Sequence, residues 1–328
     1  PPLLTNGSIK EFLIDAKKTL DNIIYAQDEV KDSILDFCCK VINTPSGKGS
    51  VLALQSLPGT GKTMIIRQGL SKILNRPFFS INFGGLSDSN ILTGHDYTYN
   101  GSSYGRICQI LIESKVMDPI IYLDEIDKIN SIKSSDIYGV LTHILDESQN
   151  THFTDNYFQG IHIDLSRVLF IISYNNEEKV DSVVSDRMNI IRMKDLLDHE
   201  KINVLKNYIL PNIYISNSCL PEDIIFTDES LKFIIQYNKH HSGMRQIKKT
   251  AENIIERINR RILSKDLRAP VNITPVVIKN IIGTPGCAII YTIRICNSIE
   301  CNISYVSTTR IGDNVFWFRK FRIVNVNI

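Results

Sequence analysis

Between residues 51 and 172, short and mostly apolar runs alternate with stretches of helical periodicity. The runs at 51–54, 78–81, 120–123 and 168–172 predict buried strands, and a helix is expected at 62–74 after the first of them. This alternation is typical of a parallel sheet with helices on both faces, because both faces of such strands are buried. We therefore expect an α/β fold.

Helical periodicity marks the chain before and after this region. It runs from about residue 9 to 41 and returns after Leu196, where helices are expected at 199–209, 229–237 and 243–263. Ser242 is the candidate N-cap of the last helix. A short strand is expected at 271–273, followed by a helix with Pro275 in its first turn. These features predict a second, smaller and mostly helical domain.

Changes in the pattern of hydrophobic and polar residues divide the chain into four segments. A polar loop rich in Gly and Pro at 44–49 ends the first, and β-branched and aromatic residues without helical period follow Gly283. We expect a helical lead-in at 1–48, an α/β domain at 49–194, a helical domain at 195–283 and a β-rich tail at 284–328.

The composition excludes several classes of protein. The 328 residues carry 37 Lys and Arg against 35 Asp and Glu, a net charge of +2 that is too balanced for nucleic-acid binding driven by bulk charge. No apolar run reaches the ~18 residues that span a bilayer, and the N-terminus does not resemble a signal peptide. The 7 cysteines are scattered without a CxxC pair, so we expect buried free thiols in a cytoplasmic or other reducing compartment. Because the chain does not begin with Met, it can be a piece of a longer protein.

A candidate phosphate-binding loop lies between the first predicted strand and its helix: Ser56-Leu57-Pro58-Gly59-Thr60-Gly61-Lys62-Thr63. Glycines let backbone N–H groups converge on phosphate oxygens, and the N-terminus of the helix adds a favourable dipole. Lys62 would reach the β- and γ-phosphates of a nucleotide, and the Thr63 hydroxyl would bind Mg²⁺. Ser56 stands where the motif normally has its first glycine. The alternative is a glycine-rich strand-to-helix turn.

A second element is the apolar strand at 120–123, which ends in two acids, Asp124 and Glu125. Because the carboxyl ends of parallel strands share one edge of a sheet, Asp124 can meet the Mg²⁺ held by Thr63. Glu125 would then polarise the attacking water as a general base. A surface acidic pair that caps the next helix is the alternative. Together, the two elements predict ATP hydrolysis.

Five further blocks occur at 94–107 (GHDYTYNGSSYGRI), 123–128 (LDEIDK), 145–150 (LDESQN), 153–157 (FTDNY) and 164–166 (DLS). The first three resemble the GHxxTYxGxxxGRI, LDEIDK and LDPEQN blocks of Lon-type AAA+ proteases, and all five follow in that family's order. The resemblance runs from about Ala16 to Gly283. It implies a AAA+ P-loop core, with the nucleotide-binding domain at 49–194 and a helical lid at 195–283.

The resemblance also implies roles for three polar residues. Asn175 matches the sensor-1 asparagine that orients the water near the γ-phosphate. Arg187 matches the finger arginine that reaches the nucleotide of the neighbouring subunit, and Arg245 matches the sensor-2 arginine of the lid. The alternatives are a loop asparagine, a surface ion pair between Arg187 and Asp186, and a solvated arginine at the start of a helix.

Two aromatic residues match the family as well. Tyr25, followed by Ala26, resembles the Tyr-Gly pair that contacts adenine. Tyr99 aligns with the aromatic residue of the first pore loop, and Asn100 stands where the family usually has an apolar residue. A ring of such loops in a hexamer can grip an extended polypeptide without reading its sequence. A tyrosine packed within its loop is the alternative.

By resemblance, the chain is expected to be an ATP- and Mg²⁺-dependent module that unfolds and translocates unfolded or damaged proteins as a homo-hexamer. Peptide-bond hydrolysis would need a Ser–Lys protease domain. The segment 309–316 weakly resembles the opening of that domain, but no nucleophile motif occurs in the sequence, so this chain alone is expected to leave casein uncut. The main alternative is a stand-alone AAA+ remodelling chaperone. Nucleic acid is not indicated as a partner, and neither is a membrane.

Overall fold

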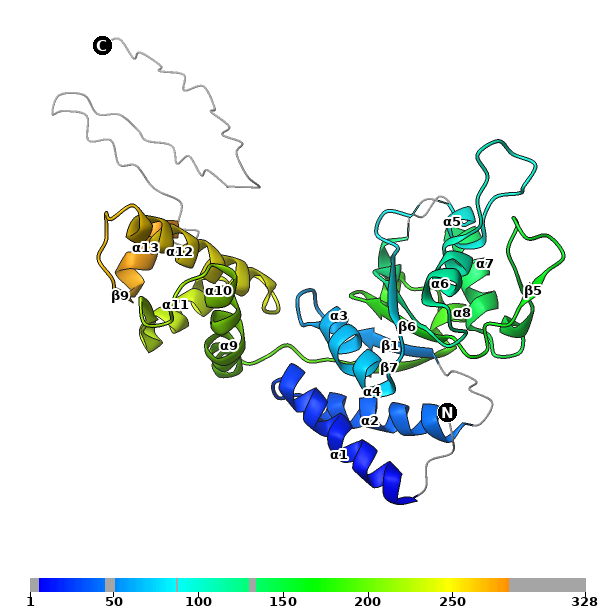
Figure 1. Ribbon diagram of the computed structural model, residues 1–328, viewed down its shortest axis with the longest axis horizontal. Helices are drawn as coiled ribbons and strands as arrows, with labels where there is room; N and C mark the ends of the chain where they lie inside the picture. Colours follow the sequence, from blue (N-terminus) through cyan, green and yellow to red (C-terminus); the bar gives the residue numbers. More distant parts are fainter. Residues whose placement is uncertain (1–5, 45–50, 87, 130–133, 283–328) are drawn as a thin grey trace, which may run out of the picture.

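The computed structural model of the chain describes residues 6–44, 51–86, 88–129 and 134–282 (Figure 1). Most of the polar loop predicted at 44–49 lies outside the described residues. The β-rich tail predicted at 284–328, including the segment 309–316, also lies outside them.

In the described part of the chain, five parallel strands form the central sheet in the order β2-β3-β6-β1-β7. They are β1 (Val51–Gln55), β2 (Phe78–Asn82), β3 (Ile120–Asp124), β6 (Leu169–Tyr174) and β7 (Met188–Arg192). The structure confirms the α/β class and the four strands expected from the apolar runs. The edge strand β7 was not expected. Only Ile191 is buried among its five residues, so no continuous apolar run marks it.

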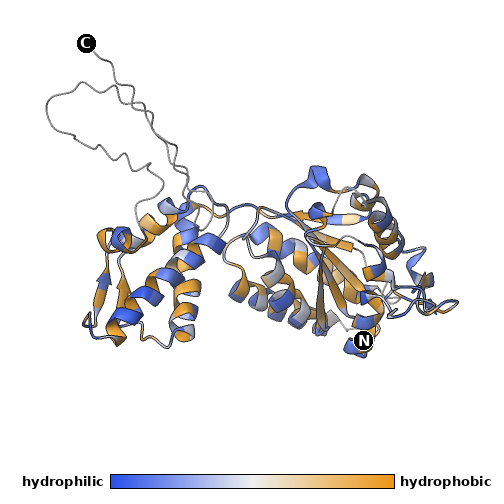
Figure 2. Cartoon of the chain, turned by 90° about the horizontal axis from the view of Figure 1, so that it is seen from above, coloured by the Kyte–Doolittle hydropathy of each residue, from blue (hydrophilic) through white to orange (hydrophobic). Residues whose placement is uncertain are grey.

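Both faces of the central strands are buried. Ala53 and Ile172 belong to the apolar core on one face of the sheet, whereas their chain neighbours Leu54 and Ile171 belong to the core on the other face. Successive side chains of a strand point to opposite faces, so strands covered on both sides are apolar throughout. Figure 2 shows these hydrophobic strands enclosed between helices.

Helices cover each face. One face carries α1 (Asn6–Ile23), α2 (Asp28–Asn43) and the helical segment after β1, which consists of α3 (Lys62–Met64), a π-helical turn at Ile65–Leu70 and α4 (Ser71–Leu74). The periodic stretch predicted at 9–41 is therefore two helices. Ala26 and Gln27 adopt left-handed backbone angles between them, with φ of 56° and 58°, and this redirects the chain.

The other face carries α5 (Asn90–Thr93), α6 (Arg106–Ser114), α7 (Ser134–Leu145) and α8 (Ser182–Ser185). Single 3₁₀ turns lie at Ile126–Lys128, Asn150–His152 and Glu177–Lys179. A short antiparallel hairpin is formed by β4 (Phe153–Thr154) and β5 (His162–Ile163). In Figure 1 this hairpin projects beside the loop between α5 and α6.

The second, mostly helical part has a core of its own. Its elements are α9 (Asp198–Val204), a π-helical turn at Leu205–Ile209, α10 (Leu210–Ser216), β8 (Ile224–Phe226), α11 (Asp228–Tyr237), α12 (Arg245–Leu263), β9 (Val271–Ile273) and α13 (Pro275–Ile282). Pro275 begins α13, as predicted. Strand β8, which pairs with β9, is only three residues long and was not expected.

The prediction that Ser242 caps the helix at its start is wrong. Helix α12 begins at Arg245, and its N-cap position is Met244, whose side chain makes no cap hydrogen bond. Gly243, which lies between Ser242 and Met244, has a φ of 71°. Its backbone packs against that of Gly59 in the candidate phosphate loop. The helix start is therefore set by a tertiary contact rather than by a capping hydroxyl.

The four described cysteines are free: Cys38, Cys39, Cys108 and Cys219. Burial raises the pKa of Cys38 to about 12, which keeps its thiol protonated and inert. Among the helices of the described ranges, none combines the length and apolar character needed to cross a membrane.

Candidate functional site

The backbone of the candidate phosphate loop depends on two glycines. Gly59 and Gly61 have φ of 83° and 97°, a region that side-chain-bearing residues rarely adopt. Gly61 is the N-cap of the helical segment that starts at Lys62, and no side chain caps the N–H groups of its first turn. The exposed N–H groups of such a turn bind anions, so the loop has the form of a phosphate cradle.

Lys62 points into this loop rather than into solvent. Its ammonium donates to the Ser56 carbonyl at 2.9 Å, to the Ser56 hydroxyl at 2.9 Å and to Asn175 Oδ1 at 2.8 Å. Burial lowers the pKa of Lys62, and the nearby carboxylates, Asp124 first, oppose that shift. Lys62 follows β1 and Asn175 follows β6. Pairing of these two strands brings together residues that lie far apart in sequence.

The Asp124 carboxylate lies at the carboxyl end of β3, next to β6. It accepts a short hydrogen bond from Ser173 and a second, at 3.3 Å, from the Tyr122 hydroxyl. That hydroxyl lies 3.4 Å from Thr63 Oγ1, so Tyr122 connects the two predicted Mg²⁺ ligands. Sequence reasoning missed Tyr122 and Ser173. Tyr122 lies two positions before Asp124, and Ser173 lies two positions before Asn175. Alternate residues share one face of a strand, so this spacing was the available signal.

Glu125 has an unusual backbone conformation for a residue with a side chain, with φ 60° and ψ 42°. Such angles cost of order 1 kcal/mol or more and concentrate at functional sites. Its side chain is 30 % exposed and forms an ion pair with Lys128 at 2.5 Å. Nearby, Asp127 Oδ2 accepts from the backbone N–H groups of Asn175 and Asn176. Glu125 is thus held at the sheet edge, within reach of solvent.

The helical part contacts the phosphate loop through the residues around Arg245. The Met244 N–H donates to the Gly59 carbonyl at 2.9 Å, and a Cβ added at Gly59 would lie 3.0 Å from Arg245 Cβ. A Cβ at Gly243 would lie 2.5 Å from the Gly59 backbone, which only glycine avoids. The structure therefore places Arg245 beside the phosphate loop, and its sensor-2 role stays a prediction.

Arg187 is not part of this cluster. Its guanidinium donates to Asp146 Oδ2 at 3.0 Å and to the Val183 carbonyl at 2.6 Å. Asp146, and not the adjacent Asp186, is the acid that it pairs with. Bonds from the Ser148 hydroxyl and backbone, and then from Arg187, lower the pKa of Asp146 to about 2.

The chain is similar in sequence to known proteins. Residues 52–196 match the family described as "ATPase family associated with various cellular activities (AAA)". The chain is 34 % identical over 242 residues to "Lon protease" of Malacoplasma penetrans, and 32 % identical over 272 residues to "Lon protease" of Aquifex aeolicus. These matches cover 74 % and 82 % of this chain. The chain carries the AAA+ module of the Lon family.

The Lon-family module spans only part of each relative. It covers 31 % of the Malacoplasma protein and 34 % of the Aquifex protein. It also covers 25 % of "Lon protease homolog, mitochondrial 1" of Dictyostelium discoideum, to which it is 34 % identical over 242 residues.

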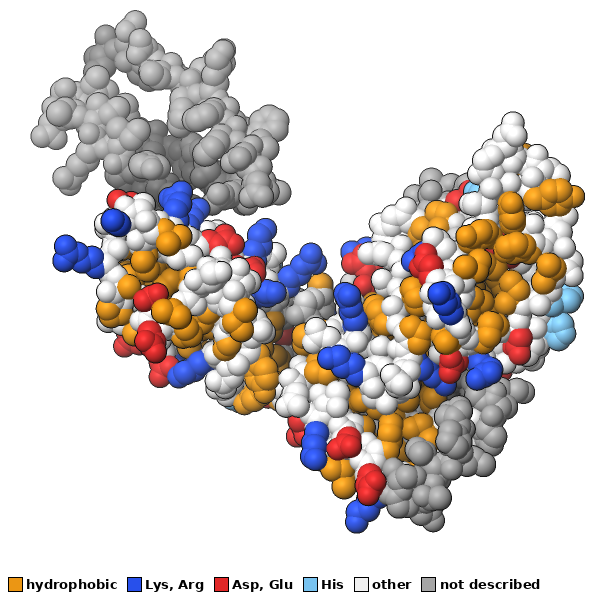
Figure 3. All heavy atoms as spheres, viewed as in Figure 1, with side chains coloured by type: hydrophobic (Ala, Val, Ile, Leu, Met, Phe, Trp, Pro, Cys, Tyr) orange, Lys and Arg blue, Asp and Glu red, His pale blue; other side chains and the backbone are white. Residues whose placement is uncertain are grey.

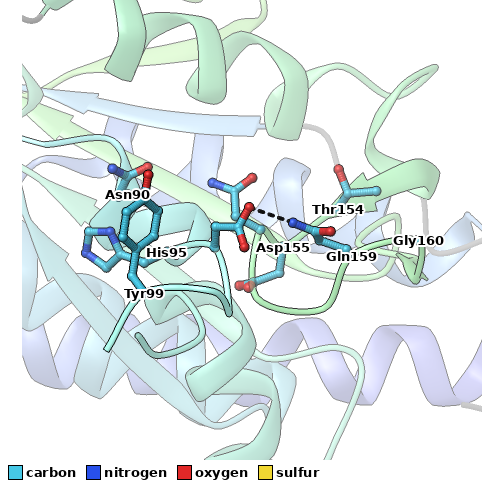
Figure 4. Close-up of a pocket in the computed structure, with 9 residues that line it drawn as sticks. Asn90, His95, Tyr99, Thr154, Asp155, Gln159 and Gly160 are labelled. Carbon is cyan, nitrogen blue, oxygen red and sulfur yellow. Dashed lines mark hydrogen bonds between the residues drawn. The ribbon is translucent and has the colours of Figure 1, made fainter. Parts of the chain in front are cut away.

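The loop between α5 and α6 carries Tyr99 and Asn100, the two residues predicted to belong to a pore loop. Tyr99 is 70 % exposed, which excludes the alternative of a tyrosine packed within its loop. The loop is tied to the β4–β5 hairpin by a hydrogen bond from Gln159 to Asp96 at 2.8 Å (Figure 4). Tyr99 lines a pocket of about 390 Å³ between the loop and the hairpin. An exposed aromatic residue is thus presented on an anchored loop.

Tyr25 of the Lon-family module lies between the lead-in and the helical part. Its hydroxyl accepts a hydrogen bond from Asn203 at 2.9 Å, and its ring centroid is 6.2 Å from that of Tyr208. The next residue, Ala26, has a φ of 56°. The glycine of the family's Tyr-Gly pair adopts such an angle freely, whereas alanine adopts it at a cost.

Proposed function

We propose that this Lon-family module hydrolyses ATP in the presence of Mg²⁺ and uses the reaction to unfold and translocate polypeptides. One observation carries the proposal: three strands bring Lys62, Asn175 and Asp124 together at one edge of the sheet. Lys62 bonds to Asn175 at 2.8 Å, while Tyr122 links Asp124 to Thr63. No two of these strands are consecutive in the chain.

The residues present suit a nucleotide with its metal ion. Gly59 and Gly61 shape an anion cradle, and Lys62 supplies a buried positive charge beside it. Mg²⁺ prefers oxygen ligands, and Thr63 with Asp124 would supply a hydroxyl and a carboxylate at the mouth of the cradle. When bound, the ion would neutralise phosphate charge.

Glu125 is the proposed general base. Its carboxylate would accept a proton from the attacking water after leaving Lys128, its partner at 2.5 Å. Asn175, which accepts from Lys62 in this structure, would orient that water. Arg245, beside the phosphate loop, would report the state of the phosphates to the helical lid.

We propose a homo-hexameric ring as the working assembly. Arg187 lies outside its own subunit's site, as required of a residue that acts on a neighbour's nucleotide. Tyr99 and Asn100 would contact unfolded or damaged polypeptides in the ring. In Figure 3 hydrophobic side chains gather over the part that carries α5 and α6. Tyr97, in the loop between these helices, is 60 % exposed. Since the four described cysteines are free, we propose a reducing compartment.

Peptide-bond cleavage, which the relatives' name implies for them, would be the work of a Ser–Lys protease domain acting with this module. The second candidate is a AAA+ remodelling chaperone that works without proteolysis. Both candidates rest on the same ATP site. Cleavage of a casein substrate by the longest natural form of the protein distinguishes them.

The test of the ATP site is Glu125→Gln. The variant should bind ATP with unchanged affinity and lose nearly all turnover, because a neutral amide cannot accept the proton. Glu178→Gln changes an exposed glutamate after β6 and should hydrolyse ATP at the wild-type rate. Wild-type turnover by Glu125→Gln, measured as phosphate release, would contradict the assignment.

A further inference from the structure

Ser56 departs from the phosphate-loop motif, and the structure shows what its hydroxyl contacts. Ser56 is 2 % exposed. Its Oγ lies 2.9 Å from Lys62 Nζ and 2.6 Å from Thr60 Oγ1. Thr60 Oγ1 in turn donates to the Leu57 carbonyl at 3.1 Å. The hydroxyls of Ser56 and Thr60 thus connect the Lys62 ammonium to the opposite side of its own loop.

These contacts use the full donor capacity of the lysine. An ammonium has three protons. Lys62 has three acceptors within 2.9 Å, the Ser56 carbonyl, the Ser56 hydroxyl and Asn175 Oδ1, and a fourth at 3.4 Å, the Leu57 carbonyl. A phosphate oxygen can therefore bind the ammonium only by replacing one of them. With glycine at position 56, the carbonyl would remain and the hydroxyl acceptor would be lost.

The Ser56 hydroxyl is the acceptor that is released most easily. Its Oγ also lies 2.6 Å from Thr60 Oγ1 and 3.2 Å from the Leu57 carbonyl, so the hydroxyl still has a hydrogen-bond partner when the ammonium leaves it. The Ser56 carbonyl is fixed by the backbone, and Asn175 comes from a different strand. An incoming phosphate would therefore replace the hydroxyl first.

We propose that Ser56 is a positioning residue that holds Lys62 in the nucleotide-free loop and competes with the phosphates of ATP for its ammonium. This inference rests on the proposed function, in which the loop binds ATP. It follows that ATP binds more weakly than it would to the same loop without the hydroxyl.

The main test is the affinity of Ser56→Ala for a slowly hydrolysed ATP analogue with Mg²⁺, measured by isothermal titration calorimetry. The substitution removes one hydrogen bond to a charged group from the nucleotide-free state only. The analogue should therefore bind about 10-fold more tightly to the variant than to the wild type, the size of effect expected of such a bond. Thr60→Val, which removes the partner that orients the Ser56 hydroxyl, should change affinity in the same direction and by less.

Thermal stability separates this role from a merely structural one. Ser56→Ala should lower the melting temperature of the nucleotide-free protein more than that of the saturated protein. The bond to Thr60 is lost in both states, whereas the bond to Lys62 is lost only in the nucleotide-free state. Ser230→Ala is the matched control. Ser230 is fully buried in the helical part and donates to the Thr227 carbonyl at 2.6 Å. The Ser230→Ala variant should lower the melting temperatures of the nucleotide-free and the saturated protein equally and leave the affinity for the ATP analogue unchanged.

The outcomes distinguish this inference from the function on which it rests. If the wild type fails to bind the analogue, the proposed function is wrong. If the wild type binds it and Ser56→Ala binds equally or more weakly, only the role of Ser56 is overturned.

Discussion

Two buried tyrosines on neighbouring strands differ in the bonding of their hydroxyls. The Tyr122 hydroxyl donates to Asp124 at 3.3 Å and lies 3.4 Å from Thr63 Oγ1. The Tyr174 hydroxyl is buried and has no hydrogen-bond partner among the described residues. Both side chains are at most 1 % exposed. Burial raises the pKa of both phenols, that of Tyr174 to about 12, so both are neutral at pH 7.

Replacing Tyr122 by phenylalanine and replacing Tyr174 by phenylalanine should therefore change the free energy of unfolding in opposite directions. Tyr122→Phe removes a hydrogen-bonded hydroxyl and should lower it by about 1 kcal/mol. Tyr174→Phe removes a polar group that is buried without a partner and should raise it by about 1 kcal/mol. The two variants should differ by about 2 kcal/mol, although the chemical change is the same.

The assay is urea or thermal unfolding of the nucleotide-free protein, followed by circular dichroism. For a domain of this size, about 2–4 °C in melting temperature corresponds to each kcal/mol. The variants should then melt about 4–8 °C apart, on opposite sides of the wild type. Shifts of the same sign would refute the reasoning, because they would show that hydroxyl bonding does not decide the outcome.

Three further experiments test other parts of the structure. Subunits with Arg187→Ala and subunits with Lys62→Ala should each be inactive alone and regain ATPase activity when mixed, since mixed rings contain intact junctions; co-assembly without rescue argues against action in trans. Ala26→Gly should stabilise the protein by about 0.5–1 kcal/mol in chemical unfolding, because glycine adopts a φ of 56° without strain, and a loss of stability contradicts this. Asp146 has a native pKa of about 2, so Asp146→Asn should be less stable than the wild type by a constant amount above about pH 4. That difference should shrink as the pH falls toward 2 and the native carboxylate is protonated, and a difference independent of pH contradicts the assignment.

Much of the fold was predictable from local pattern. The strands later seen as β1, β2, β3 and β6 were marked by apolar runs, because both of their faces are covered. Edge strand β7, with one buried residue in five, lacked that mark. The break between α1 and α2 was also missed, because Ala26 and Gln27 carry no Gly or Pro signal for their left-handed angles.

The residues of the proposed ATP site could be named from sequence, because the phosphate-loop pattern and an acidic strand end have fixed local geometries. Its connections could not. The bonds from Lys62 to Ser56 and Asn175, and from Tyr122 to Asp124, depend on which strands are neighbours and on where each side chain points. The same holds for the start of α12, which packing against the phosphate loop determines. Residue types and spacings determined what the chain could do, whereas the strand order and the packing of the helical part decided which groups meet, because contacts between distant segments form only when the whole chain folds.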